Sequence, residues 1–229
     1  MHLMDTQRMT TRSRQAALAA LVIGAGLAVA GPMPDSAVSA QSPVRTIEDG
    51  ALDKIELFVT TLEKSADLTV VIKPFDASGA NLGTGGKDGK AARQEEAKTM
   101  QNEGPRVLAE RLVATLTESK AFKAVQVAKG DEAVPAGGVV IEGKFVTLDP
   151  GSRAKRYFAG FGAGKSSVEV AGLVKDANGR TLAKFEQRRV GAMGMGGGDS
   201  LGKLMSDSKD IGEDIGKFLT KWANGADLK

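Results

Sequence analysis

The sequence lacks cysteine altogether and contains a single histidine, His2, at its N-terminal end. Without cysteine the chain can form no disulfide, no thiolate nucleophile and no cysteine-ligated zinc or iron–sulfur site. Without a histidine beyond position 2 it also lacks the imidazole of a Ser-His-Asp triad or of a histidine general base. We therefore expect no catalytic residue, no metal site and no cofactor, and predict a protein that is not an enzyme.

Long hydrophobic runs are also missing, apart from one stretch near the N-terminus. Ala16–Ala30, AALAALVIGAGLAVA, carries no charge, and three arginines precede it between positions 8 and 14. This run is too short for a helix to cross a hydrocarbon core of about 30 Å. A basic segment, a short apolar core and the small residues of Val38-Ser39-Ala40 are typical of a secretory signal peptide. We predict cleavage before Gln41, with a cut after Ala30 as the alternative.

The chain carries no large excess of either charge. It has 31 Lys and Arg against 28 Asp and Glu, and 28 basic and 26 acidic side chains remain after residues 1–40 are removed. A nucleic-acid-binding domain usually has a strongly basic face, so we expect no nucleic-acid partner. An exported chain also rarely meets a nucleotide, and the missing cysteine leaves no point for lipid attachment. The predicted location is the periplasm, as a soluble protein without a lipid anchor.

Composition and spacing divide the chain into four parts. Residues 1–40 form the signal peptide, 41–67 an N-terminal lead-in, 68–225 a single domain and 226–229 a tail. Within the lead-in, the apolar residues of 52–62 are spaced for one face of a helix, although Ile55, Leu57 and Val59 also alternate as in a strand. We prefer the helix.

Within the domain, the sequence pattern predicts five strands and three helices. Strands are expected over 68–75, 122–128, 138–148, 167–175 and 181–190, with a hairpin turn at Asp176-Ala-Asn-Gly179. A short helix is expected over 94–101, a second from Pro105, and a last one from Ser200 to a stop at Gly225. The predicted fold is α+β: a two-layer domain with a mainly antiparallel sheet of about five strands, packed by two amphipathic helices.

The two amphipathic helices are recognised by their apolar stripes. Leu108, Leu112 and Leu116 follow one another at helical spacing, and the last helix carries a stripe composed of Leu204, Ile211, Ile215, Phe218 and Trp222. In the last helix, Asp207, Asp210, Glu213 and Asp214 do not match a calcium loop, and we expect a solvated acidic face. Gly212-x-x-x-Gly216 could allow close helix contact, but outside a membrane we take it as incidental.

The most distinctive segment is Asp149–Ser166, DPGSRAKRYFAGFGAGKS, which is rich in basic residues and glycine. Its last three residues suggest a phosphate-binding loop, but that motif requires glycine where Ala159 stands, and Gly160 comes one residue too late. A strand, not a helix, is expected to follow Ser166. The spacing of its glycines does not match a dinucleotide fingerprint either.

Two interpretations of this segment remain. It is either a turn or bulge that joins two strands, or a concavity in which glycine N–H groups and basic side chains bind an anion. The anion would be a headgroup phosphate, lipopolysaccharide or an acidic glycan. The candidate binding residues are Arg153, Lys155, Arg156, Tyr157, Gly160, Gly162, Gly164 and Lys165.

The same segment resembles a known family. GSRxxRYFxGFGAGKS, followed by an ANG turn and LAKFE, is similar to the hallmark of a domain-of-unknown-function family of bacterial exported proteins, many of them described as lipoproteins. The resemblance is strongest over Ile141–Val190 and extends over Leu68–Gly225. It implies a Gram-negative envelope location and an α+β fold, and it brings no catalytic residue because the family has no established activity. This chain differs from many relatives in lacking the lipid-attachment cysteine.

These observations favour a non-enzymatic, soluble periplasmic protein that acts by binding, as an accessory factor in envelope assembly or transport. Its partner would be an envelope protein. One alternative is a binder of anionic envelope lipid or glycan through the glycine-rich segment 151–166. A hydrolase that uses only carboxylates is the third hypothesis.

Overall fold

The computed structural model describes residues 42–62, 64–83, 90–130, 134–151, 164–191 and 200–229. The predicted signal peptide lies outside these residues. In the described part of the chain, no helix has both the length and the apolar character that are needed to cross a membrane.

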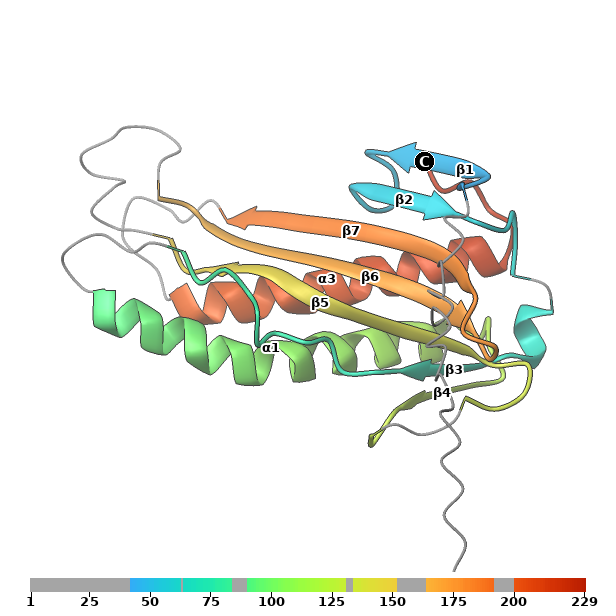
Figure 1. Ribbon diagram of the computed structural model, residues 1–229, viewed down its shortest axis with the longest axis horizontal. Helices are drawn as coiled ribbons and strands as arrows, with labels where there is room; N and C mark the ends of the chain where they lie inside the picture. The colour runs from blue at the N-terminus through green and yellow to red at the C-terminus, as the bar shows by residue number, and fades with distance from the viewer. Residues whose placement is uncertain (1–41, 63, 84–89, 131–133, 152–163, 192–199) are drawn as a thin grey trace, which may run out of the picture. The chain divides into compact units, whose positions relative to one another are not determined.

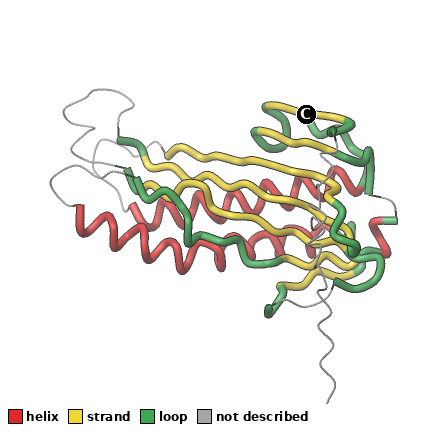
Figure 2. Tube along the Cα trace, in the orientation of Figure 1, coloured by secondary structure: helices red, strands yellow, loops and turns green. Residues whose placement is uncertain are grey.

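One mixed sheet with two long helices on one of its faces makes up this part of the protein (Figures 1 and 2). Its strands lie in the order β1-β2-β7-β6-β5-β3-β4. Their bounds are β1 Arg45–Glu48, β2 Lys54–Leu57, β3 Thr69–Ile72, β4 Ala124–Val127, β5 Val139–Asp149, β6 Ser166–Asp176 and β7 Thr181–Gly191. The helices are α1, Lys90–Ser119, and α3, Ser200–Ala223, and a short 3-10 turn, η1, spans Ser65–Asp67.

The α+β class is confirmed, but the predicted sheet of about five mainly antiparallel strands is wrong. The described sheet has seven strands, and β3 pairs in parallel with both β4 and β5. The parallel pairing follows from the chain path, since α1 connects β3 to β4 and returns the chain to the same end of the sheet. The remaining neighbours, from β1 to β5, are antiparallel.

The two additional strands form a hairpin where a helix was expected over 52–62. Ile47 lies opposite Ile55, and both are buried. Asp49 adopts a left-handed conformation with φ 51° and its N–H donates to the carbonyl of Asp53 at 2.9 Å, which turns the chain. The 226–229 segment is no free tail, because Leu228 is buried and its carbonyl accepts from the N–H of Ala51 at 2.7 Å.

Both helices bury the predicted apolar stripes, although α1 is longer than expected. It runs without a break through Pro105, where a helix start was predicted. Proline there removes the backbone hydrogen bond that residue 105 would donate to the carbonyl of Gln101. The side-chain amide of Gln101 separately donates to the carbonyl of Ala77 at 2.9 Å. The stripe of α3 is fully buried, and Gly225 ends that helix with φ 64°.

The two helices lie side by side and parallel, in close contact through glycine. A Cβ atom on Gly212 would lie 2.5 Å from the carbonyl oxygen of Leu108, and one on Gly216 would lie 2.6 Å from Cγ2 of Thr115. The prediction that this glycine pair is incidental is therefore wrong. Next to this contact, Glu213 forms ion pairs with Arg111 of α1 and with Lys217 of α3. The hydrogen bonds from Lys217 and Arg111 lower the pKa of Glu213 to about 2.

A row of aromatic rings fills the core between the sheet and α3. The ring centroids of Phe145 and Phe75 are 6.5 Å apart, those of Phe75 and Phe185 6.4 Å, and those of Phe185 and Phe218 6.1 Å. Phe218 stacks on Trp222 at 5.8 Å. Such contacts add stability beyond the area that they bury. The opposite face of the sheet carries exposed charged side chains, which include Lys144, Lys184, Glu186 and Arg188.

The close helix contact predicts the effect of a single methyl group. Alanine normally stabilises a helix by about 1 kcal/mol over glycine, but in Gly212→Ala the methyl would press against backbone of α1, which cannot rotate away. We expect the free energy of unfolding to fall by about 1–3 kcal/mol, the usual effect of overpacking. Urea denaturation measures it.

The matched control is Ser206→Ala, an exposed position on the same helix, which should leave stability unchanged or slightly raised. A Gly212→Ala protein at least as stable as the wild type would show that the helices do not need this contact.

Candidate functional site at the loop end

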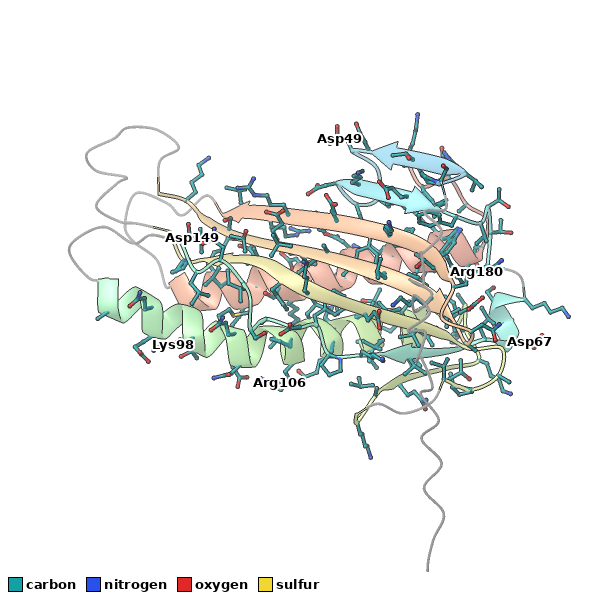
Figure 3. The ribbon with its side chains drawn as sticks, viewed as in Figure 1. Asp49, Asp67, Lys98, Arg106, Asp149 and Arg180 are labelled. Carbon is teal, nitrogen blue, oxygen red and sulfur yellow. The ribbon has the colours of Figure 1, made fainter. Side chains whose placement is uncertain are left out.

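Three strands and two helices begin or end at the same end of the sheet, which we call the loop end. β5 and β7 finish there, at Asp149 and Gly191, and β6 begins there at Ser166 (Figure 1). α1 and α3 also begin at this end, because both run parallel to β6. Figure 3 shows Asp149 at the loop end and Arg180, in the β6–β7 turn, at the opposite end.

The distinctive segment is the connection between β5 and β6, which are antiparallel neighbours with Asp149 opposite Ser167. The connection is closed at its base. Gly151 and Gly164 both have φ 76°, a conformation that favours glycine, and a Cβ atom on Gly151 would lie 2.4 Å from the carbonyl oxygen of Gly164. The carboxylate of Asp149 accepts a hydrogen bond from the N–H of Gly151 at 2.7 Å. The chain therefore leaves and re-enters the sheet at one point.

Most of the predicted binding residues lie outside the described residues: Arg153, Lys155, Arg156, Tyr157, Gly160 and Gly162. The structure places the other two at the start of β6. Gly164 is half-buried at the base of the connection, and Lys165 is exposed beside it. Because 152–163 starts and ends at this base, all eight predicted residues belong to one connection.

Two further connections start at the same end. The segment 84–89 leaves from Gly83, which lies against the carboxylate of Asp149, and 192–199 joins Gly191 to α3. In sequence, the three connections and their flanking residues Lys90 and Lys165 carry six basic and two acidic side chains. The N-termini of two helices add positive partial charge to the same end. The three connections that start at the loop end therefore carry a net positive charge in sequence.

Beneath the loop end, the core between α3 and the sheet contains polar side chains as well as the buried Val168 and Leu204. The polar side chains are those of Ser166, Arg189, Lys203, Asp207 and Ser208, which we call the polar core end. Contacts in this cluster lie within α3 and between α3 and the strands. Lys203 forms an ion pair with Asp207, and a Cβ atom on Gly191 would lie 2.4 Å from Oγ of Ser166 and 3.0 Å from Cε of Lys203.

Arg189 ties β7 to α3 within this cluster. Its guanidinium lies 2.6 Å from the carboxylate of Asp214 and 3.4 Å from that of Asp210. Burial lowers the pKa of Arg189, but the hydrogen bond to Asp214 and the charges of Asp214, Asp210 and Asp207 outweigh burial, so that the pKa is raised. The arginine stays charged and is neutralised by carboxylates of the helix.

The polar core end was missed from the sequence. Asp207, expected on a solvated face, is 1% exposed, and Ser208 is fully buried. One signal was present: Ser208 stands four residues after Leu204 and three before Ile211, within the apolar stripe of α3. A polar residue inside such a stripe indicates a polar partner on the facing element.

Four polar atoms of the cluster find no hydrogen-bond partner in the described part of the chain. They are Oγ of Ser166 and Ser208, Oδ2 of Asp207 and Nε of Arg189. A buried polar atom left without a partner destabilises a fold by about 1–3 kcal/mol. No group of three His, Cys, Asp or Glu side chains converges among the described residues as metal ligands would. The side chains of this cluster offer hydrogen-bonding groups and charges.

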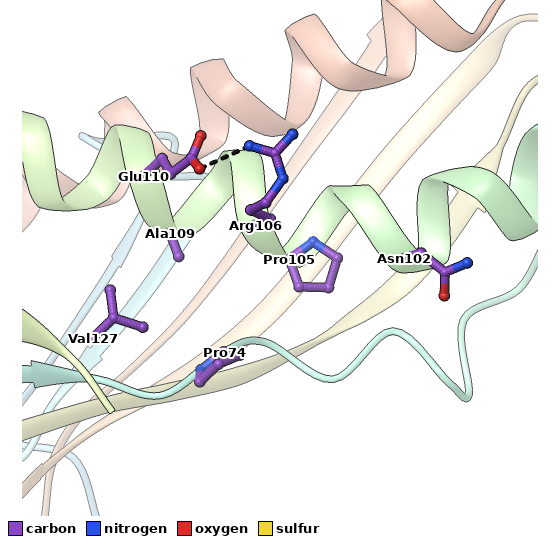
Figure 4. Close-up of a pocket in the computed structure, with 7 residues that line it drawn as sticks. All are labelled: Pro74, Asn102, Pro105, Arg106, Ala109, Glu110 and Val127. Atoms are coloured by element: carbon purple, nitrogen blue, oxygen red, sulfur yellow. Dashed lines mark hydrogen bonds and ion pairs between the residues drawn. The ribbon is translucent and has the colours of Figure 1, made fainter. Parts of the chain in front are cut away.

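A separate groove lies between α1 and the β3–β4 edge of the sheet (Figure 4). It has a volume of 430 Å³ and is lined mainly by the apolar atoms of Pro74, Pro105, Ala109 and Val127. An ion pair between Arg106 and Glu110, at 2.7 Å, forms its rim. None of the predicted site residues lies in it.

The amino-acid sequence of this domain matches the model of a known family. The chain belongs to the family described as "Domain of unknown function (DUF4410)", which matches residues 70–195 and so includes the distinctive segment. No curated protein matches the sequence.

Among solved structures, a PelC dodecamer from Paraburkholderia phytofirmans is similar in two crystal forms. One, a single-substitution variant, has a TM-score of 0.40 and 13% identity and covers 74% of this chain and 97% of its own. The other has a TM-score of 0.37 and 12% identity, with 70% and 95% covered. An uncharacterised protein has a TM-score of 0.35 and 13% identity, with 69% and 94% covered.

The link between β7 and α3 predicts different effects at two adjacent arginines. Arg189→Met leaves the half-buried carboxylate of Asp214 without its closest partner. We expect a loss of about 1–3 kcal/mol in the free energy of unfolding, the range for a buried polar group that loses its partner. Urea denaturation of both variants measures it.

Arg188→Met is the control, since Arg188 points to the opposite face and its ion pair to Glu169, at 3.8 Å, is exposed. A surface pair of this kind contributes about 0–1 kcal/mol. Equal losses for the two variants would contradict the role given to Arg189.

Proposed function

We propose that this protein is an exported, non-enzymatic binding protein of the bacterial cell envelope, soluble in the periplasm, and that it binds its partner at the loop end. The partner carries negative charge. Anionic envelope lipid, lipopolysaccharide or an acidic glycan fits this description, as does an acidic surface on an envelope protein that the chain assists in assembly or transport.

The observation that carries the proposal is the closed base of the β5–β6 connection. Gly151 and Gly164 meet there, so the basic side chains between them in sequence belong to one connection rather than to separate regions. Lys165, which follows this base, is exposed. Clustered basic side chains and glycine N–H groups are the usual means of binding a phosphate or carboxylate.

The electrostatic setting supports an anionic partner. α1 and α3 both begin at the loop end, and the positive end of a helix dipole attracts anions within about one turn. The exposed face of the sheet is different, because its charges alternate in sign. Glu142 there pairs with Lys175 and Lys73, and the hydrogen bond from Lys175 lowers the pKa of Glu142.

The absence of Cys and His from residues 41–229 supports a role in binding rather than catalysis. The short apolar run before Val38-Ser39-Ala40 supports export. Since the sequence after it contains no cysteine, a lipid anchor is not part of the proposal.

Export predicts a defined N-terminus. The protein purified from the periplasm of a Gram-negative host should begin at Gln41, as read by N-terminal sequencing or intact mass. Ala40→Leu, which places a bulky residue where small ones are required, should block cleavage at this position. A purified chain that begins upstream of residue 31 would contradict export through this leader.

Binding at the loop end predicts a charge-dependent loss of retention. Vesicles of anionic phospholipid, or of lipopolysaccharide, should retain the wild-type protein at low salt and release it as salt rises. Arg153→Ala with Arg156→Ala should weaken retention at least tenfold, measured by co-sedimentation.

The control pair is Lys184→Ala with Arg188→Ala, which removes the same charge from the exposed face of the sheet and should retain the wild-type affinity. Equal retention of both pairs would refute an anionic ligand at the loop end. Loss in both pairs would show attraction by overall charge alone.

A further inference from the structure

The contact between α3 and the sheet changes in character along the helix. From Ile211 to Trp222, the helix buries the large apolar side chains of Ile211, Ile215, Phe218, Leu219 and Trp222, each at most 2% exposed, and Asp214 adds an ion pair to Arg189 of β7. Before Ile211, the buried positions are Leu204, Asp207 and Ser208. The first two turns of α3 are thus held by one fully buried apolar side chain, that of Leu204, by the partly buried Leu201 and Met205, and by polar groups.

Four buried polar atoms, two on the strands and two on α3, have no hydrogen-bond partner among the described residues. Ser166 of β6 is fully buried, and its hydroxyl has no partner among the described residues. The same holds for the hydroxyl of Ser208, for Oδ2 of Asp207 and for Nε of Arg189. Each of these atoms gives up hydrogen bonds to water in the closed structure and receives none in return from the described residues.

We propose that the first two turns of α3, Ser200–Ser208, open from the sheet as a unit while the helix from Ile211 onward stays packed. Opening costs the burial of Leu204 and the partial burial of Leu201 and Met205, and it separates Lys203 from the strands. In return, it hydrates all four unpartnered atoms at once. The boundary lies where the stripe turns apolar, and local opening of this kind begins where buried apolar contacts are few.

Opening would have a direct consequence for the loop end. It uncovers Ser166, the first residue of β6, and Lys203, which lies beside Gly191 at the end of β7. Both strand ends belong to the base from which the connections depart. The proposal concerns the free protein and does not depend on the identity of any ligand.

Residue-resolved hydrogen exchange, followed by NMR on the purified protein, tests it. The amides of Asp207 and Ser208 bond within the helix to the carbonyls four residues earlier, so ordinary fraying of the first turn does not release them. We expect both to exchange at least tenfold faster than the amides of Ile215 and Phe218. Protection equal to that of Ile215 would overturn the proposal.

Substitutions at position 208 give a second, independent test. Ser208→Ala removes one unpartnered hydroxyl, and Ser208→Leu extends the apolar stripe; at least one should slow exchange at Asp207 several-fold, while Phe218 is unchanged. Ser206→Leu, on the exposed side of the same turn, is the matched control and should change nothing. If Ser208→Ala speeds exchange at Asp207, the hydroxyl is satisfied in the native state and the proposal fails.

Discussion

The close packing of α1 against α3 is the constraint on which the rest of the structure depends. Gly212 brings the backbone of α3 to the carbonyl of Leu108, and this contact fixes two parallel helices on one face of the sheet. Since the helices are parallel, both begin at the same end. The antiparallel pairing of β5, β6 and β7 places the end of β5, the start of β6 and the end of β7 together. Helix packing and strand pairing together therefore define the loop end.

The two ends of the core serve different purposes. Toward the β6–β7 turn, the aromatic row from Phe75 to Trp222 and the hairpin β1–β2 make a dry, apolar interior that holds the fold together. Toward the loop end, the interior contains an arginine, a lysine and carboxylates that neutralise them. Removing charges from water is costly, and replacing them with apolar residues would often be neutral or stabilising.

Much of the fold could be predicted from local pattern, because five strands and the stripe of α3 follow regular periods. The hairpin β1–β2 could not. The apolar residues of 52–62 fit both the spacing of a helix and the alternation of a strand, and only the pairing of β2 with β7 decides for the strand. The parallel pairing of β3 and the continuity of α1 through Pro105 are likewise set by distant contacts. For the site, the glycine-rich segment was visible as a motif. Burial of Asp207 was not, because it depends on Lys203 in the same helix and on Arg189 across the core.

The central claim is that the loop end is the binding surface, and a footprint of the bound protein tests it most directly. Hydrogen exchange measured with and without vesicles of anionic phospholipid or lipopolysaccharide should show added protection at 164–168, at 189–191 and in the first turns of α3. Residues 177–180, in the turn at the opposite end, and β4, beside the apolar groove, should be unchanged. Protection confined to β4 and the groove, or to the 177–180 turn, would contradict the account.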